Sequence, residues 1–197
     1  MVFLDVAVLG LIVGKLLGGR LSGLGEIRIR AKWLAFAAIA IQLVAFPLDF
    51  LPWATPSGVA SALWLASYGL LVAMLIANVR LPGTPLIAAG LVCNVVAIVA
   101  NGGLMPVRAS ALQAAGTEYD VHQNSIQLTE PRLGPLIDRW AAPDWLPLAN
   151  VYSVGDVLIG VGLLVVIVAA MRLPAGRTPS PTGVVGEAAA SAGNAKS

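Results

Sequence analysis

The sequence predicts an all-α membrane protein, a bundle of five transmembrane helices with an ordered external segment that contains short interfacial helices. Hydrophobic residues make up 58% of the chain and charged residues only 11%, with a mean hydropathy of +0.85. Soluble domains carry about a quarter charged residues, so the composition excludes an ordinary soluble domain. The pI near 9.0 does not indicate a nucleic-acid partner, because the basic residues form no patch with interleaved aromatic residues.

Five apolar runs approach the roughly 17–25 residues that a helix needs to cross the hydrocarbon core. The expected spans cover residues 2–18, 33–50, 58–78, 85–100 and 155–171. The first run is expected to be retained and not cleaved as a signal peptide, because it lacks a basic start and carries Asp5. Gly10, Gly14 and Gly18 repeat at four-residue spacing in this run, which predicts close packing against another helix or against a second copy of the chain.

The distribution of lysine and arginine predicts the orientation of the bundle. One side has the acidic residues Glu26 and Glu187 against the basic residues Lys15, Arg20, Arg28, Arg30, Lys32, Arg80, Arg172, Arg177 and Lys196. The other side has Arg108, Arg132 and Arg139 against the acidic residues Asp5, Asp49, Glu118, Asp120, Glu130, Asp138, Asp144 and Asp156. We therefore expect an inner (plasma) membrane protein with its N-terminus outside, its C-terminus in the cytoplasm and an acidic external face.

Residues 1–172 are expected to form the membrane bundle, and residues 173–197 a disordered cytoplasmic tail rich in Pro, Gly, Ala and Ser. The external segment, residues 101–154, carries signals for order. Ser110 and Gln113 are spaced as a capping box, which predicts a short helix that Gly116 would end.

A second external helix is expected to begin at Pro135 and to lie in the outer membrane interface. Its apolar stripe consists of Leu133, Leu136, Ile137 and Trp140. Asp138 would lie on the opposite face of this helix and point toward water.

Polar side chains within the apolar runs are few. Asn94 and Asn101 are seven residues apart and share a helix face, which predicts that both amides point into the bundle interior, with Gln42 as a candidate partner. Such amides mostly join helices, and a continuous polar path past Asn94 and Gln42 would be needed for a permease. His122 has no second histidine nearby, so no metal site and no cofactor are expected. Cys93, the only cysteine, is expected to be a small buried residue.

Three acidic residues at the outer rim are the candidate catalytic groups: Asp138, Asp144 and Asp156. Two carboxyl groups that share a proton can activate water for amide hydrolysis. The alternative for Asp156 is structural, because Ser153 three residues earlier completes a capping box at the start of the last apolar run. The sequence favours the cap and leaves a catalytic role open.

Four separated motifs resemble the bacterial membrane proteins grouped as domain of unknown function 5317. They are GKLLGGRLSGLGEIRIRAKWL, NGGLMPV, TEPRLGPLIDRW and NVYSVGDVLIGVG, in this order along the chain. That family carries no assigned activity. The resemblance implies that its characteristic residues here are Asn101, Gly102, Gly103, Pro106, Ser153, Gly155 and Asp156.

A fainter resemblance is to lipoprotein signal peptidases, which are membrane aspartyl proteases. NGG is similar to their Asn-x-Gly motif, GPLIDR to their Gly-Asn-x-x-Asp-Arg motif and YSVGD to their Phe-Asn-x-Ala-Asp motif. Pro135 and Ser153 replace the asparagines of the last two motifs, and no apolar span separates Asn101 from Asp138, where the peptidases have two. No second aspartate follows in the Val-Asp-Phe context of the peptidases, so only Asp138 or Asp144 could substitute for it. The resemblance implies a pair formed by Asp156 with Asp138 or Asp144.

Two functions therefore follow from the sequence. The first is a structural or binding membrane module whose acidic external cap recognises a partner protein or an envelope lipid. The second is a membrane aspartyl hydrolase. The hydrolase requires two of the three carboxyl groups within hydrogen-bond or one-water reach, whereas the binding module requires only that Asp156 cap its helix.

Overall fold

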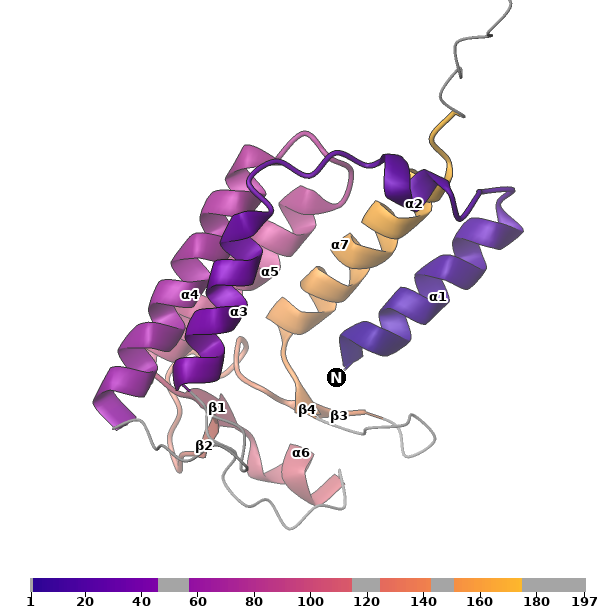
Figure 1. The fold of residues 1–197 in the computed structure, drawn as a ribbon. Coiled ribbons are helices and arrows are strands. Elements are labelled where there is room, and N and C mark those ends of the chain that lie inside the picture. Colours follow the sequence, from indigo (N-terminus) through magenta and orange to yellow (C-terminus); the bar gives the residue numbers. More distant parts are fainter. Residues whose placement is uncertain (1, 46–56, 115–124, 143–150, 175–197) are drawn as a thin grey trace, which may run out of the picture.

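The computed structural model describes residues 2–45, 57–114, 125–142 and 151–174, and within these ranges the chain is mostly helical. Asp144, His122 and most of the expected tail lie outside the described residues. The helices are α1 (Val2–Leu16), α2 (Gly23–Glu26), α3 (Trp33–Ala45), α4 (Ser57–Ala77), α5 (Thr84–Ala100), α6 (Ala109–Ala114) and α7 (Val154–Met171). Five of them are long and lie side by side, packed in the order α3, α4, α5, α7 and α1 (Figure 1).

All five predicted apolar runs are helical, and their described ends lie within two residues of the prediction. Two helices, at Gly58–Ala77 and Val154–Met171, are long and apolar enough to cross a membrane. The expected number of five such spans is not reached among the described residues, because α1 has 15 residues, α3 13 and α5 17. Helix α1 stops at Leu16 because the chain turns there, with the Gly19 amide bonded to the Gly14 carbonyl oxygen.

Helices α5 and α7 pack against each other through pairs of glycines. A Cβ added at Gly90 would collide with the Gly155 carbonyl oxygen, and one added at Gly83 with that of Gly162. Gly90 follows Gly83 by seven residues, whereas its partner Gly155 precedes Gly162 by seven residues. The two helices are therefore antiparallel. Only glycine permits backbones to approach this closely.

Helix α1 packs on the other side of α7. A Cβ at Gly10 would contact Ile167, and one at Gly14 would collide with Met171. The predicted small-residue groove is therefore filled by α7 of the same chain at these two positions. Gly18, the third residue of the repeat, lies beyond the end of the helix.

One end of the helical row is covered by a cap made of α6 and four short strands (Figure 1). The strands are β1 (Met105–Val107), β2 (Ser125–Gln127), β3 (Trp140–Ala141) and β4 (Val151–Tyr152). Strands β1 and β2 are parallel, and β3 and β4 are antiparallel. A single bridge between Val107 and Asp138 joins the segment before β3 to β1.

The predicted interfacial helix from Pro135 is wrong, because residues 132–137 form turns that lead directly into β3. Leu133 has a left-handed backbone, with φ 56°, and its carbonyl oxygen accepts a tight turn bond from Leu136. The Asp138 amide then bonds to the Pro106 carbonyl oxygen of β1 and not to a preceding turn of helix. The local apolar stripe is overridden by pairing with a distant strand.

The other predicted external helix exists but begins earlier than expected. Helix α6 starts at Ala109, and the Arg108 carbonyl oxygen accepts bonds from the amides of Ala111 and Leu112. Ser110 is thus inside the helix and does not cap it. The predicted end at Gly116 lies outside the described residues.

Candidate functional site

Asp156 lies in the first turn of α7 and closes a capping box with Ser153. The Ser153 hydroxyl oxygen accepts a hydrogen bond from the Asp156 amide at 3.1 Å. In return, Oδ2 of Asp156 accepts a bond from the Ser153 amide at 2.9 Å. The capping box predicted from the sequence is confirmed, and it fixes the direction in which the Asp156 carboxylate points.

The other carboxylate oxygen of Asp156 is bound by a neighbouring helix. The buried Asn94 of α5 donates a hydrogen bond from Nδ2 to Oδ1 of Asp156 at 2.9 Å. The Ser153 hydroxyl lies 2.9 Å from Oδ1 of Asn94 and 2.9 Å from Oδ2 of Asp156, so its proton goes to one of these two oxygens. A Cβ on Gly155 would collide with the Asn94 side chain, which explains the glycine at this position.

Asp138 reaches the same region from the cap. Its amide donates to the Pro106 carbonyl oxygen at 3.1 Å, and its own carbonyl oxygen accepts from the Arg108 amide at 2.9 Å. The next residue, Arg139, donates its amide to the Tyr152 carbonyl oxygen of β4 at 3.1 Å. Backbone bonds on both sides therefore hold Asp138 rigidly between β1 and β4.

The Asp138 side chain is buried, with only 8% of the residue exposed, so the expectation that it points toward water is wrong. Its Oδ1 is fully buried and has no hydrogen-bond partner among the described residues. Burial, and secondarily the negative charge of Asp156, raises the pKa of Asp138 to about 8. Burial therefore favours the protonated form of Asp138 at neutral pH, and Asp156 lies within electrostatic reach of it.

A third polar group was not anticipated from the sequence. Tyr68 of α4 lies within electrostatic reach of both Asp156 and Asp138. Its ring packs edge-on against Trp64, in the core cluster at the cap end of the helices. The only sequence signal was a tyrosine inside an apolar run, which is too common to single out.

The NGG motif ends α5 in a Schellman arrangement. The Gly103 amide donates to the Ile98 carbonyl oxygen at 2.9 Å, and the Gly102 amide to that of Val99 at 3.4 Å. Gly102 and Gly103 have φ of 82° and 96°, a conformation that residues with side chains rarely adopt. The two glycines thus redirect the chain from α5 into β1.

Asn101 and Pro106 complete the connection between this turn and Asp138. The Asn101 side chain donates to the Arg132 carbonyl oxygen at 2.9 Å and accepts from the Arg132 amide at 2.8 Å. Pro106 is fully buried, and its carbonyl oxygen receives the Asp138 amide. The residues of the motif therefore position the segment that carries Asp138.

Other expectations have mixed outcomes. Gln42 donates to the Ser67 hydroxyl at 3.0 Å, so its predicted pairing with Asn94 is wrong. The Asn101 side chain donates both to the Ala97 carbonyl oxygen of its own helix and to the Arg132 carbonyl oxygen in the cap. Cys93 is half-buried in α5. Over the described ranges, no cluster of three or more metal-ligating side chains occurs.

Comparison with known proteins gives a family. The family model described as "Family of unknown function (DUF5317)" matches residues 26–168, which include every residue of the site described above. The chain belongs to this family. No curated protein and no solved structure matches the chain. The geometry of Asn94, Asp138, Ser153 and Asp156 is therefore the available guide to what this DUF5317 member does.

The pairing of a protonated carboxyl group with a hydrogen-bonded carboxylate is chemically useful. The first can donate a proton and the second can accept one, which is the division of labour in acid–base catalysis. Perturbed titratable groups of this kind are concentrated in functional sites. In this DUF5317 chain burial raises the pKa of Asp138, and the capping box fixes the position of the Asp156 side chain.

Proposed function

We propose that the chain is a multi-pass membrane protein with five helices across the bilayer and the cap on its outer side. Apolar side chains are exposed along the helices, notably Leu4, Val8, Ile12 and Leu16 on α1 and Trp33, Phe36, Ile39 and Leu43 on α3. Exposed apolar faces of this extent are unfavourable in water and match a lipid environment. The excess of basic residues at the end opposite the cap supports a cytoplasmic position for that end. The charged residues described there are Lys15, Arg20, Glu26, Arg28, Arg30, Lys32, Arg80 and Arg172.

Within this frame, we propose that the cap carries a hydrolytic site in which Asp138 is the acid and Asp156 the base. The observation that supports it is the burial of Asp138 within electrostatic reach of Asp156, with one Asp138 oxygen that has no hydrogen-bond partner among the described residues. The proposed substrate is a membrane-associated peptide, in which one amide bond is hydrolysed. Substrate must displace side chains of the cap to reach Asp138, since the residue is 8% exposed.

The proposed reaction conserves protons between the two residues. The Asp156 carboxylate takes a proton from water, the water oxygen bonds to the amide carbon, and the Asp138 acid protonates the carbonyl oxygen. In the second step the carbon–nitrogen bond breaks. Asp156 then gives its proton to the leaving nitrogen, while one hydroxyl of the intermediate returns a proton to Asp138.

The resemblance of YSVGD to the last motif of lipoprotein signal peptidases supports a catalytic Asp156, which matches the aspartate at the start of their last helix. The first catalytic aspartate of those peptidases follows their Gly-Asn-x-x-Asp-Arg motif, and Asp138, which matches the aspartate within that motif, would substitute for it. The peptidase motif has an asparagine at the position of Ser153. In this chain the amide that binds Asp156 comes instead from Asn94 of α5.

The test uses the full chain reconstituted in vesicles with a set of single-span peptides that carry a fluorophore and a quencher. We expect new amino termini with the wild-type protein and none with Asp138→Asn or Asp156→Asn. Asp5→Asn is the matched control, because Asp5 is an acidic residue of α1 outside the site. Absence of cleavage by the wild type across the whole set would contradict the hydrolase.

A second candidate function is a non-catalytic cap that binds a partner protein or an envelope lipid. It is favoured by the capping role of Asp156, which a purely structural site also requires. The two candidates predict different effects of Asp138→Asn. For a hydrolase, the substitution abolishes peptide cleavage. For a binding cap, it changes stability but leaves the recovery of cross-linked partners unchanged.

A further inference from the structure

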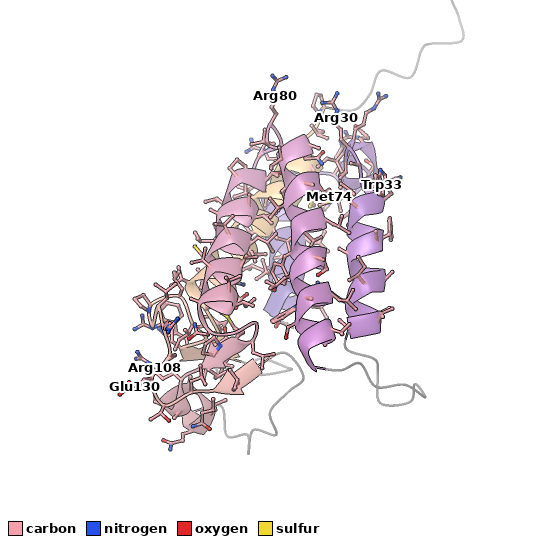
Figure 2. All side chains as sticks on the ribbon, turned by 90° about the vertical axis from the view of Figure 1, so that its left-hand side faces the viewer. Arg30, Trp33, Met74, Arg80, Arg108 and Glu130 are labelled. Atoms are coloured by element: carbon pink, nitrogen blue, oxygen red, sulfur yellow. The ribbon has the colours of Figure 1, made fainter. Side chains whose placement is uncertain are left out.

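A second polar region lies at the end of the helices opposite the cap. A cavity of about 360 Å³ lies where the segment before α3 meets the end of α4, and its lining includes Arg28, Arg30 and Arg80. Arg30 and Arg80 project beyond the helix ends on this side of the molecule, far from Arg108 and Glu130 of the cap (Figure 2). Three cations therefore gather around one cavity.

The position of this arginine segment is fixed by a buried side chain. Oδ1 of Asn78 accepts a hydrogen bond from the Arg30 amide at 2.8 Å, and Nδ2 of Asn78 donates one to the Arg30 carbonyl oxygen at 2.8 Å. The same Nδ2 donates to the Met74 carbonyl oxygen at 2.7 Å, which anchors the clamp to α4. Asn78 is itself 6% exposed, so the backbone that carries Arg30 is held in one place.

The three arginines have no carboxylate partner among the described residues. The ion pair present there joins Arg20 to Glu26 at 3.4 Å, and neither residue lines the cavity. Glu26 is also the sole acidic residue between Leu16 and Ala45. Three uncompensated guanidinium groups favour an anion, and guanidinium matches the geometry of phosphate through paired hydrogen bonds.

Apolar side chains border the same cavity. Ile76 and Val79 line it and are 66% and 54% exposed. Trp33 is exposed at the start of α3 near Arg30 (Figure 2), in the place where tryptophan marks a membrane interface. A ligand that fits this surface combines an anionic head with an apolar body.

We infer that this cavity binds the phosphate of an anionic phospholipid, with the head group on Arg28, Arg30 and Arg80 and an acyl chain along Ile76 and Val79. Basic pockets between membrane helices on the cytoplasmic side bind such head groups. The inference rests on the membrane location proposed above but not on the carboxylate pair.

The experiment measures lipid binding to the detergent-purified full chain by native mass spectrometry. Phosphatidylglycerol, phosphatidylcholine and inorganic phosphate are added separately. We expect one tightly bound phosphatidylglycerol and no comparable phosphatidylcholine. In the variant Arg28→Gln/Arg30→Gln/Arg80→Gln, binding should be about 100-fold weaker, since each arginine contributes roughly fivefold near an anionic lipid surface.

Two control variants distinguish lipid binding at this cavity from a general attraction of anionic lipid to a basic protein. Arg172→Gln removes an exposed cation at the end of α7 that does not line the cavity, and it should retain wild-type binding. Asp138→Asn should also retain it. Equal loss in Arg172→Gln, or full binding in the triple variant, would overturn the inference. Inorganic phosphate binding as tightly as the lipid would assign the site to free phosphate and overturn the lipid assignment.

Discussion

The carboxamide nitrogen of Asn94 lies 2.9 Å from Oδ1 of Asp156 and so ties the middle of α5 to the first turn of α7. The bond joins residues 62 positions apart and passes beside Gly155, where a side chain would block it. It connects the capping box to the helix bundle. The position of the Asp156 carboxylate is therefore set by two helices and not by one.

Removal of this bond should destabilise the fold. Asn94→Ala leaves Oδ1 of Asp156 without its donor in a partly buried place, and we expect a loss of about 1–3 kcal/mol in the free energy of unfolding. Thermal unfolding of the detergent-purified protein, followed by circular dichroism, measures it. Val92→Ala on the exposed face of the same helix should change stability far less, and equal losses would refute the assignment.

Gly155→Ala should be more damaging than an alanine in an open part of a helix. Its Cβ would collide with the Asn94 side chain and the Gly90 carbonyl oxygen, which forces α5 and α7 apart. Overpacking of this kind costs about 1–3 kcal/mol. Gly69→Ala in α4 is the matched control, because apart from its own helix no atom of the described residues lies within 4 Å of the added Cβ, and its melting temperature should stay unchanged or rise.

Ser153→Ala should weaken the start of α7. The substitution removes the acceptor for the Asp156 amide, and loss of an N-cap side chain costs roughly 0.5–2 kcal/mol. Ser110→Ala is the control, because Ser110 is a solvent-exposed serine within α6 and not its N-cap. A similar fall in melting temperature for both variants would argue against the cap as the cause.

The stability of the protein should fall as the pH rises from about 4 to about 8. Asp138 has a pKa of 3.8 in its reference state and about 8 in the fold, so between these values the folded chain binds the extra proton. Each pH unit in this window then removes up to about 1.4 kcal/mol of stability. Asp138→Asn should flatten this dependence, whereas Asp5→Asn should retain it; an unchanged slope in Asp138→Asn would refute the burial argument.

Hydrolysis by the reconstituted protein should decrease as the pH rises through about 8. Above this value Asp138 loses the proton that it donates to the carbonyl oxygen. General acid catalysis contributes roughly 100- to 10,000-fold, so Asp138→Asn should lower the rate by at least the smaller factor. Initial rates of peptide cleavage between pH 5 and pH 10 measure both effects, and a rate that keeps rising above pH 9 would exclude Asp138 as the acid.

The sequence was a good guide to local structure. Long apolar runs bounded by glycine and proline predicted the helices, because helix periodicity and end signals lie within a few residues of each other. The capping box of Ser153 and Asp156 was predicted for the same reason. Its partner Asn94 was correctly expected to face inward, but the group it binds was not identifiable from one helix alone.

The cap was predicted poorly because distant contacts determine it. Strands of two or three residues carry no periodicity, and the β1–β2 pair joins Met105 to Ser125. The apolar stripe from Leu133 to Trp140 favoured a helix, yet the left-handed Leu133 and the bond from Asp138 to Pro106 replaced it. Burial of Asp138 follows from these pairings and therefore could not be read from its neighbours.

The contact between Gly90 and Gly155 also has a consequence for biosynthesis. The ribosome completes α5 at Ala100 before it has made any of α7, and Gly155 is the 55th residue added after Ala100. At a translation rate of about 5–20 residues per second, several seconds pass before the part of α7 that packs against the α5 glycines has been synthesised. During that interval the nascent chain offers an unfilled groove to an insertion factor or chaperone, so substitutions at Gly90 should lower the yield of folded protein in cells.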